Sequence, residues 1–257
     1  MKALSIVTVT RNNFEQLKIT FDSVRKNNSL EFEYIVIDGK SDDGTKKLID
    51  NNLGLIDKFL SEKDNGIYHA MNKGLKIASG RFVLFLNSGD RILNLNKVIK
   101  DIKNLSQNEK KILLYASEYS WSDSMSKIIA PNFSFCTMPT SHQAIIFPTD
   151  IAKQLEYNLT YQYSADYDLY LSILTQKNFS FQAYKDVIVK TAPVGFTNNS
   201  IFDYLIECYD INSKYNNKIL SIIRFLIELI KLQIKYFINK FFTKSLLDYL
   251  RKLRGGY

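Results

Sequence analysis

A run of five apolar residues, 82–86, ends abruptly in the polar sequence Asn-Ser-Gly-Asp at residues 87–90. A short apolar run bounded by turn-forming residues is typical of a strand that is buried on both faces. Open α/β sheets bind ligands at the carboxyl ends of their strands, where polar side chains of neighbouring loops meet. A carboxylate there, such as Asp90, can hold a hard divalent cation against a diphosphate. The segment therefore predicts a nucleotide-diphosphate site.

Two aspartates mark a second candidate site much later in the chain. Asp166 and Asp168 lie at the start of residues 165–175, whose pattern predicts a helix. A carboxylate beside a reacting hydroxyl can act as a general base. Because positions i and i+2 do not share a helix face, at most one of the two is expected to point into a site. The other is accounted for by capping, since Asp is common at helix N-termini.

Strands and helices alternate along the first third of the chain. Apolar periodicity and turn residues predict strands at 4–10, 33–37, 58–60 and 82–86, with helices at 13–26, 45–52 and 66–79. Alternation of this kind implies a parallel sheet with right-handed crossovers, which would bring the strand ends together. The second half is less regular, with strands predicted at 112–118, 126–130, 144–147 and 181–191 and helices at 165–175 and 201–213.

The composition is that of an ordinary globular protein, with 46% hydrophobic and 23% charged residues. Its 257 residues can bury the core of one large α/β domain. The two cysteines, Cys136 and Cys208, lie far apart, which argues against a disulfide framework or a zinc site. Only two histidines are present, so a multi-histidine metal centre is not expected. The first residues lack the features of a signal peptide, and we expect a cytoplasmic protein.

The C-terminal segment carries most of the positive charge. Residues 218–257 include nine basic and two acidic residues, which gives this segment +7 of the net charge of +8. Arg224, Glu228 and Lys231 fall on one polar stripe of a predicted helix, and apolar residues cover much of the rest. The longest uncharged run, 219–223, is far shorter than a transmembrane span. The pattern is compatible with three roles: contact with an anionic membrane surface, packing on the rest of the chain, or dimerisation.

Five segments resemble, in this order, the motifs of one known family. They are SIVTVTRNN, YIVIDGKSDDGT, EKDNGIYHAMNKGLKIASG, FLNSGD and SADYDLYLSI. Together they resemble glycosyltransferase family 2, whose members have the GT-A fold and move a sugar from a nucleotide-sugar donor. The resemblance covers residues 2–194 and implies an α/β fold with a Rossmann-like, mostly parallel central sheet flanked by helices. We expect a nucleotide-sugar-binding half at 1–91, an acceptor-binding half at 92–217, and an amphipathic helical extension at 218–257.

The resemblance also implies which residues bind the donor. The matching positions are Thr8, Thr10, Arg11, Asp38, Asp42, Asp64, Gly66, Asn72, Lys73, Asn87 and Ser88. Asp90 keeps the last carboxylate of the family's DxD-type motif and would hold Mg²⁺ or Mn²⁺, although Asn87 and Gly89 stand where acidic residues are usual. Arg11 or Lys73 would neutralise the leaving diphosphate. Plain structural roles remain open, because Asp42 could cap a helix and Lys73 could be a solvated helix residue.

On the acceptor side, the family uses an Asp at the start of the late helix as the general base of a single, inverting displacement. The match falls on Asp166 first and Asp168 second, and His142 with Gln143 matches a pair that faces the acceptor cleft. The resemblance implies a UDP-sugar donor and transfer of a hexosyl or N-acetylhexosaminyl group. The acceptor would be a saccharide or a polyprenyl-diphosphate-linked sugar in bacterial surface-polysaccharide assembly. Residues 218–254 would then bring the enzyme to the inner face of the cell membrane.

Three other interpretations compete with this one. A nucleotidyltransferase would carry a Gly-rich loop after the first strand, and residues 8–13 contain no glycine. A non-catalytic nucleotide-sugar-binding relative, recruited to membranes by its basic tail, would be compatible with the missing acidic neighbours of Asp90. The lysines and aromatic residues of the tail could in principle contact nucleic acid, but no RNA-binding signature accompanies them, and we expect no nucleic-acid partner.

Overall fold

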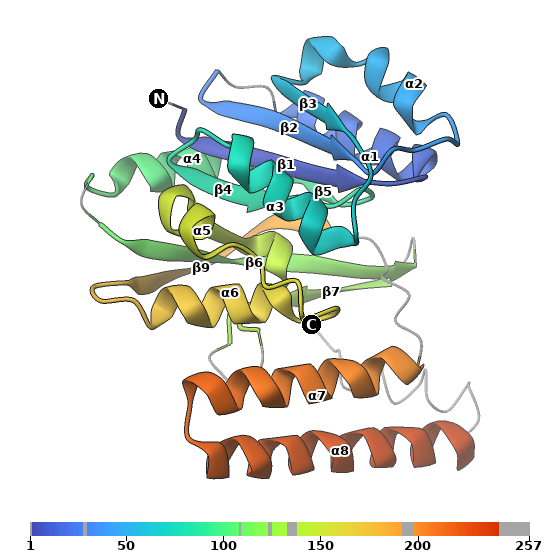
Figure 1. Ribbon diagram of the computed structural model, residues 1–257, viewed down its shortest axis with the longest axis vertical. Helices are drawn as coiled ribbons and strands as arrows, with labels where there is room; N and C mark the ends of the chain where they lie inside the picture. Colours follow the sequence, from blue (N-terminus) through green and yellow to red (C-terminus); the bar gives the residue numbers. More distant parts are fainter. Residues whose placement is uncertain are drawn as a thin grey trace.

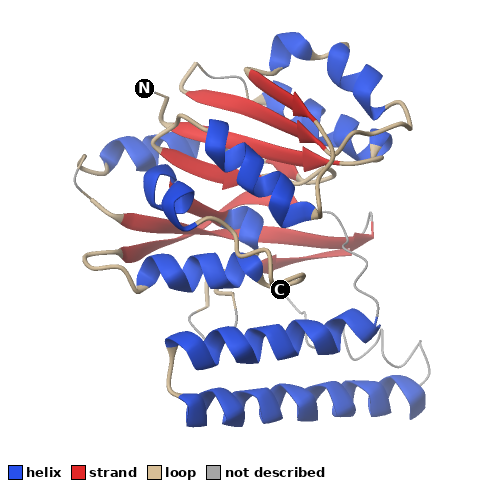
Figure 2. Cartoon of the chain, in the orientation of Figure 1, coloured by secondary structure: helices blue, strands red, loops and turns tan. Residues whose placement is uncertain are grey.

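The computed structural model describes residues 2–27, 30–107, 109–122, 125–132, 138–191 and 198–241. Within them, nine strands form one sheet with helices packed against it (Figures 1 and 2). The strands are β1 (Leu4–Thr10), β2 (Phe32–Asp38), β3 (Lys58–Ser61), β4 (Phe82–Phe85), β5 (Arg91–Ile92), β6 (Lys111–Ser122), β7 (Met125–Ile129), β8 (Ile145–Pro148) and β9 (Ser180–Thr191). The strand order is β3-β2-β1-β4-β8-β6-β9-β5, and β7 pairs with β6.

The helices connect these strands and extend the chain beyond them. They are α1 (Phe14–Lys26), α2 (Thr45–Asp50), α3 (Ile67–Ile77), α4 (Leu95–Asn104), α5 (Thr149–Leu155), α6 (Ala165–Leu174), α7 (Asn198–Tyr215) and α8 (Lys218–Phe241), with short 3₁₀ turns η1 (Leu53–Leu55) and η2 (His142–Ala144). The sequence patterns predicted most of these elements to within a few residues. They did not predict α4, α5 or the short strand β5.

The first four strands form the parallel unit expected from the sequence. β2 pairs with β1 and β3, and β1 pairs with β4, all in parallel. From β4 onward the sheet becomes mixed, because β8 runs antiparallel to both β4 and β6, while β6 and β9 are parallel. The carboxyl ends of β1, β2, β3 and β4 therefore meet at one edge, which is where the sequence places its donor-site residues.

Alternation along the central strands produces a hydrophobic core on each face of the sheet. Successive side chains of a strand point to opposite faces. In β1, Leu4 and Ile6 join the core beneath α1 and α4, whereas Val7 and Val9 join the core beneath α3, α5 and α6. Because both faces are covered by helices, every residue of β1, β2 and β4 is buried, and β4 is apolar throughout, as the run at 82–86 indicated.

The C-terminal helices form a hairpin at one side of the molecule (Figure 1). α7 packs against α6, and α8 packs against α7, where the rings of Tyr209 and Phe225 lie 5.3 Å apart. α8 confirms a helix over 218–241, while the remaining predicted tail, residues 242–257, lies outside the described residues. No helix in the described part of the chain is long and apolar enough to cross a membrane.

Candidate active site

Asp38 lies at the centre of the edge where the parallel strands end. It pairs in register with Thr10 of β1 and with Ser61 of β3. Its carboxylate is fully buried and accepts hydrogen bonds from the hydroxyls of Ser61 (2.6 Å) and Ser41 (2.5 Å). A buried carboxylate needs such donors, because an unpaired one costs several kcal/mol. Asp38 therefore joins the loop that follows β2 to the end of β3.

The loops after β1 and β2 are interlocked by side chain–backbone hydrogen bonds. Asn12, whose φ of 48° lies in the left-handed region, donates its backbone N–H to the Ser41 hydroxyl (2.8 Å). Its side-chain oxygen accepts the backbone N–H of Asp42 (2.9 Å). Asp43 accepts the first N–H groups of both α1 and α2, at 3.4 and 3.0 Å. The capping role considered for Asp42 thus belongs to Asp43, and the Asp42 side chain stays exposed.

Arg11 and Asp64 approach each other across the backbone of Gly39. A methyl group placed on Gly39 would lie 2.3 Å from Oδ2 of Asp64 and 3.1 Å from the Cβ of Arg11. Real Cβ atoms do not come that close to an oxygen, so only glycine allows this approach. The sequence analysis did not single out Gly39. The DG dipeptide after a buried strand was the signal that could have identified it.

The turn before α3 is built on Gly66, whose φ of 119° is readily adopted only by glycine. The N–H of Gly66 binds Oδ1 of Asp64 (3.1 Å), and the preceding N–H, of Asn65, binds Nδ1 of His69 (3.0 Å). These bonds fix the position of Asp64 beside Gly39. The positive φ of Gly66 thus sets the turn that leads into α3.

Three predicted donor-site residues are bonded within the protein. Lys73 donates to the carbonyl of Lys63 (2.6 Å) and pairs with Glu62 (3.0 Å). Asn72 uses both ends of its amide on the backbone N–H and carbonyl of Tyr157, at 2.8 and 2.9 Å. Thr8, which is fully buried, accepts the hydroxyl proton of Tyr34 (3.0 Å). These contacts position α3 and its neighbouring loops, which leaves Arg11 as the more accessible cation at this edge.

Asp90 ends the turn that follows β4 and is almost completely buried. Its Oδ2 accepts the backbone N–H of Asn87 (3.1 Å) and the side-chain amide of Gln143 (3.0 Å). Several buried oxygens close to this turn have no hydrogen-bond partner within the described residues. They are Oγ1 of Thr10, Oδ1 of Asn87, Oγ of Ser88 and Oγ of Ser141. Unsatisfied polar atoms that gather at one place are expected where a polar ligand binds.

A chain of polar contacts leads from this turn to the start of α6. The Asn87 amide lies 3.1 Å from Nε2 of His142, and Nδ1 of His142 lies 3.6 Å from Oδ2 of Asp166. The Tyr68 hydroxyl donates to the other carboxylate oxygen of Asp166 (3.4 Å). Residues from four distant segments of the chain thus meet at one place. Tyr68 was missed by the sequence analysis, although it lies inside the quoted segment, two positions after Gly66.

Asp166 has a pKa that is shifted by its surroundings. Burial raises its pKa above the ordinary value, and the attraction of His142 opposes that shift. Its neighbour Tyr68 also has a raised pKa, because of burial and of the Asp166 charge, and therefore remains a hydrogen-bond donor. Carboxyls with such shifts, placed beside polar groups at a strand edge, are frequent at active sites.

Asp168 has different surroundings although it lies only two residues further along α6. Its Oδ1 pairs with Lys214 (3.1 Å) and accepts the hydroxyl proton of Tyr215 (3.0 Å), both at the end of α7. The expectation that at most one of the two acids would point into the site agrees with this geometry. Asp168 ties α6 to α7, and Asp166 faces His142.

The oxygen atoms around Asp90 suit a hard divalent cation. No group of three or more His, Cys, Asp or Glu residues that could hold a metal occurs in the described ranges. At the turn after β4, the described residues bring the carboxylate of Asp90 close to the unsatisfied Oδ1 of Asn87. Mg²⁺ is commonly bound by one or two carboxylates together with phosphate oxygens and water. The donor set fits such an ion provided that the substrate diphosphate completes it.

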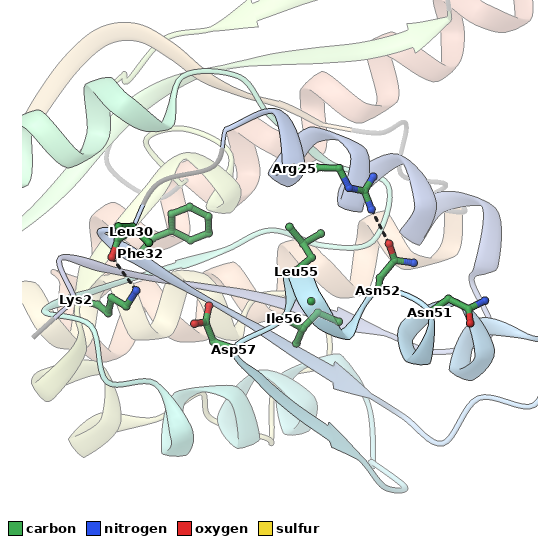
Figure 3. A pocket seen from close by; sticks show the side chains of 10 residues that line it. Lys2, Arg25, Leu30, Phe32, Asn51, Asn52, Leu55, Ile56 and Asp57 are labelled. Atoms are coloured by element: carbon green, nitrogen blue, oxygen red, sulfur yellow. Dashed lines mark hydrogen bonds between the residues drawn. The ribbon is translucent and has the colours of Figure 1, made fainter.

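A separate cavity of about 510 Å³ lies at the opposite, amino-terminal ends of the strands (Figure 3). Its polar lining is largely paired internally, since Lys2 binds the carbonyl of Leu30 (2.7 Å) and Arg25 binds the amide oxygen of Asn52 (2.6 Å). Phe32 of β2 lies against it as well. The cavity is distinct from the residues around Asp90 and Asp166.

Comparison with known proteins agrees with this geometry. The family model described as glycosyl transferase family 2 matches residues 5–159, which is more than half of the chain. The chain belongs to glycosyltransferase family 2. Its match covers the four parallel strands, the turn with Asp90 and the His142–Gln143 pair, and it ends just before Asp166.

Individual members of glycosyltransferase family 2 resemble the chain over most of its length. A PGL/p-HBAD biosynthesis glycosyltransferase of Mycobacterium bovis is 24% identical over 211 residues, covering 77% of this chain and 80% of that protein. The UDP-Glc:alpha-D-GlcNAc-diphosphoundecaprenol beta-1,3-glucosyltransferase WfgD of Escherichia coli is 27% identical over 182 residues, covering 69% and 72%.

The fold is also that of solved GT-A glycosyltransferases. S. aureus TarS 1–349, solved in complex with UDP-GlcNAc, superposes with a TM-score of 0.61 at 18% identity, covering 82% of this chain and 66% of TarS. Family membership and fold thus agree.

Proposed function

We propose that the protein is an inverting glycosyltransferase that uses a UDP-sugar, with Asp166 as the general base. The observation that carries this proposal is the contact chain from Asn87 through His142 to Asp166. It brings the carboxyl with a raised pKa next to the turn that would hold the donor diphosphate. The alternative base, Asp168, is instead bonded to Lys214 and Tyr215 at the end of α7.

The reaction is a single displacement at the anomeric carbon. The acceptor hydroxyl transfers its proton to a carboxylate oxygen of Asp166 while its oxygen forms a bond to that carbon. The bond between the anomeric carbon and the diphosphate oxygen breaks on the opposite side, and UDP leaves with the electron pair. Burial raises the pKa of Asp166, which makes it a stronger base than an ordinary Asp. Tyr68 and His142 orient it.

The donor is held by the edge of the parallel strands. Asp38 accepts hydrogen bonds from the uracil ring, and Arg11 lies where it can approach the diphosphate. Asp90 and Oδ1 of Asn87 are the groups that would hold Mg²⁺ or Mn²⁺ beside the diphosphate. When bound, such an ion offsets the negative charge on the leaving UDP. Asn72 and Lys73 act through the loops that they hold in place.

The acceptor is a sugar linked to a lipid diphosphate, or a saccharide, in surface-polysaccharide assembly. This part rests on the similarity to WfgD, whose name describes a diphosphoundecaprenol-linked acceptor. The transferred group is a hexose or N-acetylhexosamine, in line with the sugars in the names of WfgD and of the TarS complex.

The decisive experiment measures transfer and slow hydrolysis across UDP-, GDP- and dTDP-sugars, with Mn²⁺, Mg²⁺ or EDTA. Wild type is compared with Asp90→Ala, Asp166→Asn and the matched control Asp168→Asn. We expect one UDP-sugar to be used, with activity lost in EDTA and in Asp90→Ala. Asp166→Asn should lower kcat by about a hundredfold or more and leave UDP binding intact. Asp168→Asn should keep most of the turnover per folded molecule.

Each contrary result points to a different error. Full turnover of Asp166→Asn would remove that residue as the base, and loss confined to Asp168→Asn would exchange the two roles. Activity that survives both EDTA and Asp90→Ala would remove the metal. Calorimetry that shows no binding of UDP to the wild type would overturn the donor site itself.

A further inference from the structure

Helix α8 presents a broad aliphatic surface to solvent. Eight of its Ile and Leu side chains, among those described, are between 44% and 68% exposed. They are Ile219, Leu220, Ile222, Ile223, Leu226, Ile227, Ile230 and Ile234. We call these eight residues the outer face of α8. At 3.6 residues per turn they cover an arc of about 160°, which is wider than the narrow seam of a two-stranded coiled coil.

The opposite side of α8 is the side that packs on α7. Ser221 is buried there, and Phe225 contacts Tyr209 of α7. Arg224 and Glu228, on the polar stripe seen in the sequence, are half-buried rather than freely exposed. The stripe expected to face water thus borders the α7 contact, and the apolar residues point outward. A helix that packs its apolar face on a hydrophobic core would show the reverse arrangement, with apolar residues buried and charged residues exposed.

We propose that the outer face of α8 is a docking surface for an anionic lipid membrane, on which the helix lies flat. The charge of the segment selects this occupant. Residues 218–257 carry +7 of the protein's net +8, and the one acid in α8, Glu228, is paired with Lys231 (2.6 Å). An apolar arc flanked by basic residues matches the boundary between anionic headgroups and acyl chains. A second copy of the chain would instead bring two strongly positive segments together.

The helix is suited to lie on a bilayer and not to span it. In the described ranges no helix meets the length and apolarity of a membrane span. Basic residues recur along α8, at Lys218, Arg224 and Lys231, so the polar side continues for the length of the helix. Each Leu or Ile buried in the lipid contributes favourable transfer free energy, and each nearby Lys or Arg adds a smaller electrostatic attraction.

Docking through α8 would place the catalytic residues at a defined distance from the lipid surface. α7 lies between α8 and α6, and it is hydrogen-bonded to the segment that leads into α6. Glu207 of α7 accepts the backbone N–H groups of Gln162 and Tyr163, at 2.7 and 2.9 Å, just before Asp166. The hairpin therefore connects the docking surface rigidly to the base. This placement would bring the proposed base close to a membrane-bound acceptor. The docking surface itself does not depend on the proposed chemistry.

The test is flotation of the full-length protein with vesicles of phosphatidylcholine, with and without phosphatidylglycerol. The main variant is Leu226→Asn with Ile230→Asn, which removes two outer-face side chains without changing charge. We expect it to bind the anionic vesicles about a hundredfold less tightly than the wild type. Lys231→Ala should weaken binding about fivefold, and only to vesicles that contain phosphatidylglycerol. Leu53→Asn, an exposed leucine on η1, is the matched control and should bind as the wild type does.

Two further measurements on the same variants separate lipid from the other occupants. Sedimentation should show the same mass for the wild type and the double variant. A wild-type dimer that dissociates in the variant would mean that a second copy of the chain, and not lipid, covers the outer face of α8. Thermal unfolding should be unchanged in the double variant, and a clear loss would mean that the chain itself covers this face. Wild-type protein that fails to float with either vesicle would overturn the proposal. UDP binding is measured in parallel. Protein that binds UDP but does not float would overturn the docking surface and leave the proposed function standing.

Discussion

Glu33, near the amino ends of the central strands, and Asp166, near their carboxyl ends, are both acids taken out of water. Glu33 accepts hydrogen bonds from Ser5, from Ser79 and from the N–H of Gly80, and it pairs with Lys58 (2.8 Å). Burial alone would raise the pKa of Glu33, but Lys58, Ser5 and Ser79 outweigh it and bring the pKa down to about 2.

Asp166 shows the opposite balance. It accepts the backbone N–H of Tyr167 (2.9 Å), but its side-chain contacts to Tyr68 and His142 are longer, at 3.4 and 3.6 Å, and burial prevails, so its pKa is raised. The comparison teaches how to separate structural from functional acids in one fold. A carboxylate saturated with donors stabilises the protein and is poor at accepting a proton. A carboxylate left under-satisfied destabilises the folded state and is available for chemistry.

Asp166→Asn should give the largest effect and should divide activity from stability. We expect kcat to fall by about a hundredfold or more. The raised pKa means that the folded state disfavours the ionised carboxyl, so at neutral pH the wild type bears a cost that the amide does not. The variant should therefore be at least as stable as the wild type in urea at pH 7. A large loss of stability in this variant would place Asp166 in the same class as Glu33.

Glu33→Gln should show the reverse pattern. Removing the charge breaks the ion pair between the buried Glu33 and the half-exposed Lys58, and we expect a loss of about 3 kcal/mol in the free energy of unfolding. UDP affinity and turnover per folded molecule should not change, because Glu33 lies at the far end of the strands. Asp22→Asn, which breaks an exposed ion pair with Arg25, is the control and should cost less than about 1 kcal/mol. Equal losses in the two variants would refute the special role of Glu33.

The depressed pKa of Glu33 predicts that the stability of the folded protein depends on pH. The pKa of Glu33 is depressed in the folded protein, so its stabilisation is complete above about pH 4.5 and is lost as the pH falls toward about 2. The difference in unfolding free energy between wild type and Glu33→Gln should shrink across that window. Urea unfolding at a series of pH values measures it. A difference that stays constant down to the lowest pH would show that hydrogen-bond geometry, not charge, explains the effect.

Residues 1–91 could be predicted from the sequence because their signals are local. Each central strand is a short, mostly apolar run; Asp38 ends one of them, and Asp90 ends the polar turn after another. α4 was missed although Leu95, Val98, Ile99 and Ile102 recur at helical spacing behind the cap residue Asn94. That periodicity indicates a helix in this segment. α5, with seven residues, is too short for its period to be distinguished from a loop.

Residues 92–217 could be predicted only in part, because their contacts join distant segments. Whether Asp166 or Asp168 faces the site depends on Lys214 and Tyr215, which lie 46 and 47 residues further along the chain. The role of Asn72 depends on the backbone of Tyr157, 85 residues away. No local pattern encodes such pairings, so the sequence alone left the two acids unresolved and assigned Asn72 to the ligand.

Glu207→Gln tests whether α7 positions the segment before the base. The amide keeps one acceptor but turns an N–H₂ group toward a backbone donor, which should cost about 1 kcal/mol of stability. We expect a modest fall in kcat with unchanged UDP affinity, because the segment containing Gln162 and Tyr163 leads directly into Asp166. Glu207→Asp, which keeps the charge, should recover part of the loss. A change in UDP affinity with kcat intact would assign Glu207 to the donor side instead.

His142→Gln should give the smallest effect, and it addresses the pKa of Asp166 directly. The base acts when deprotonated, so kcat/KM falls as the pH drops through its pKa, and burial places that acidic limb above the range of an ordinary Asp. His142 opposes the shift, so removing its attraction should move the limb to still higher pH. At pH values well above the limb, the variant should lose little activity through this effect. If the limb moved to lower pH, His142 would be raising the pKa of Asp166 rather than lowering it, and the electrostatic contrast with Glu33 would rest on burial alone.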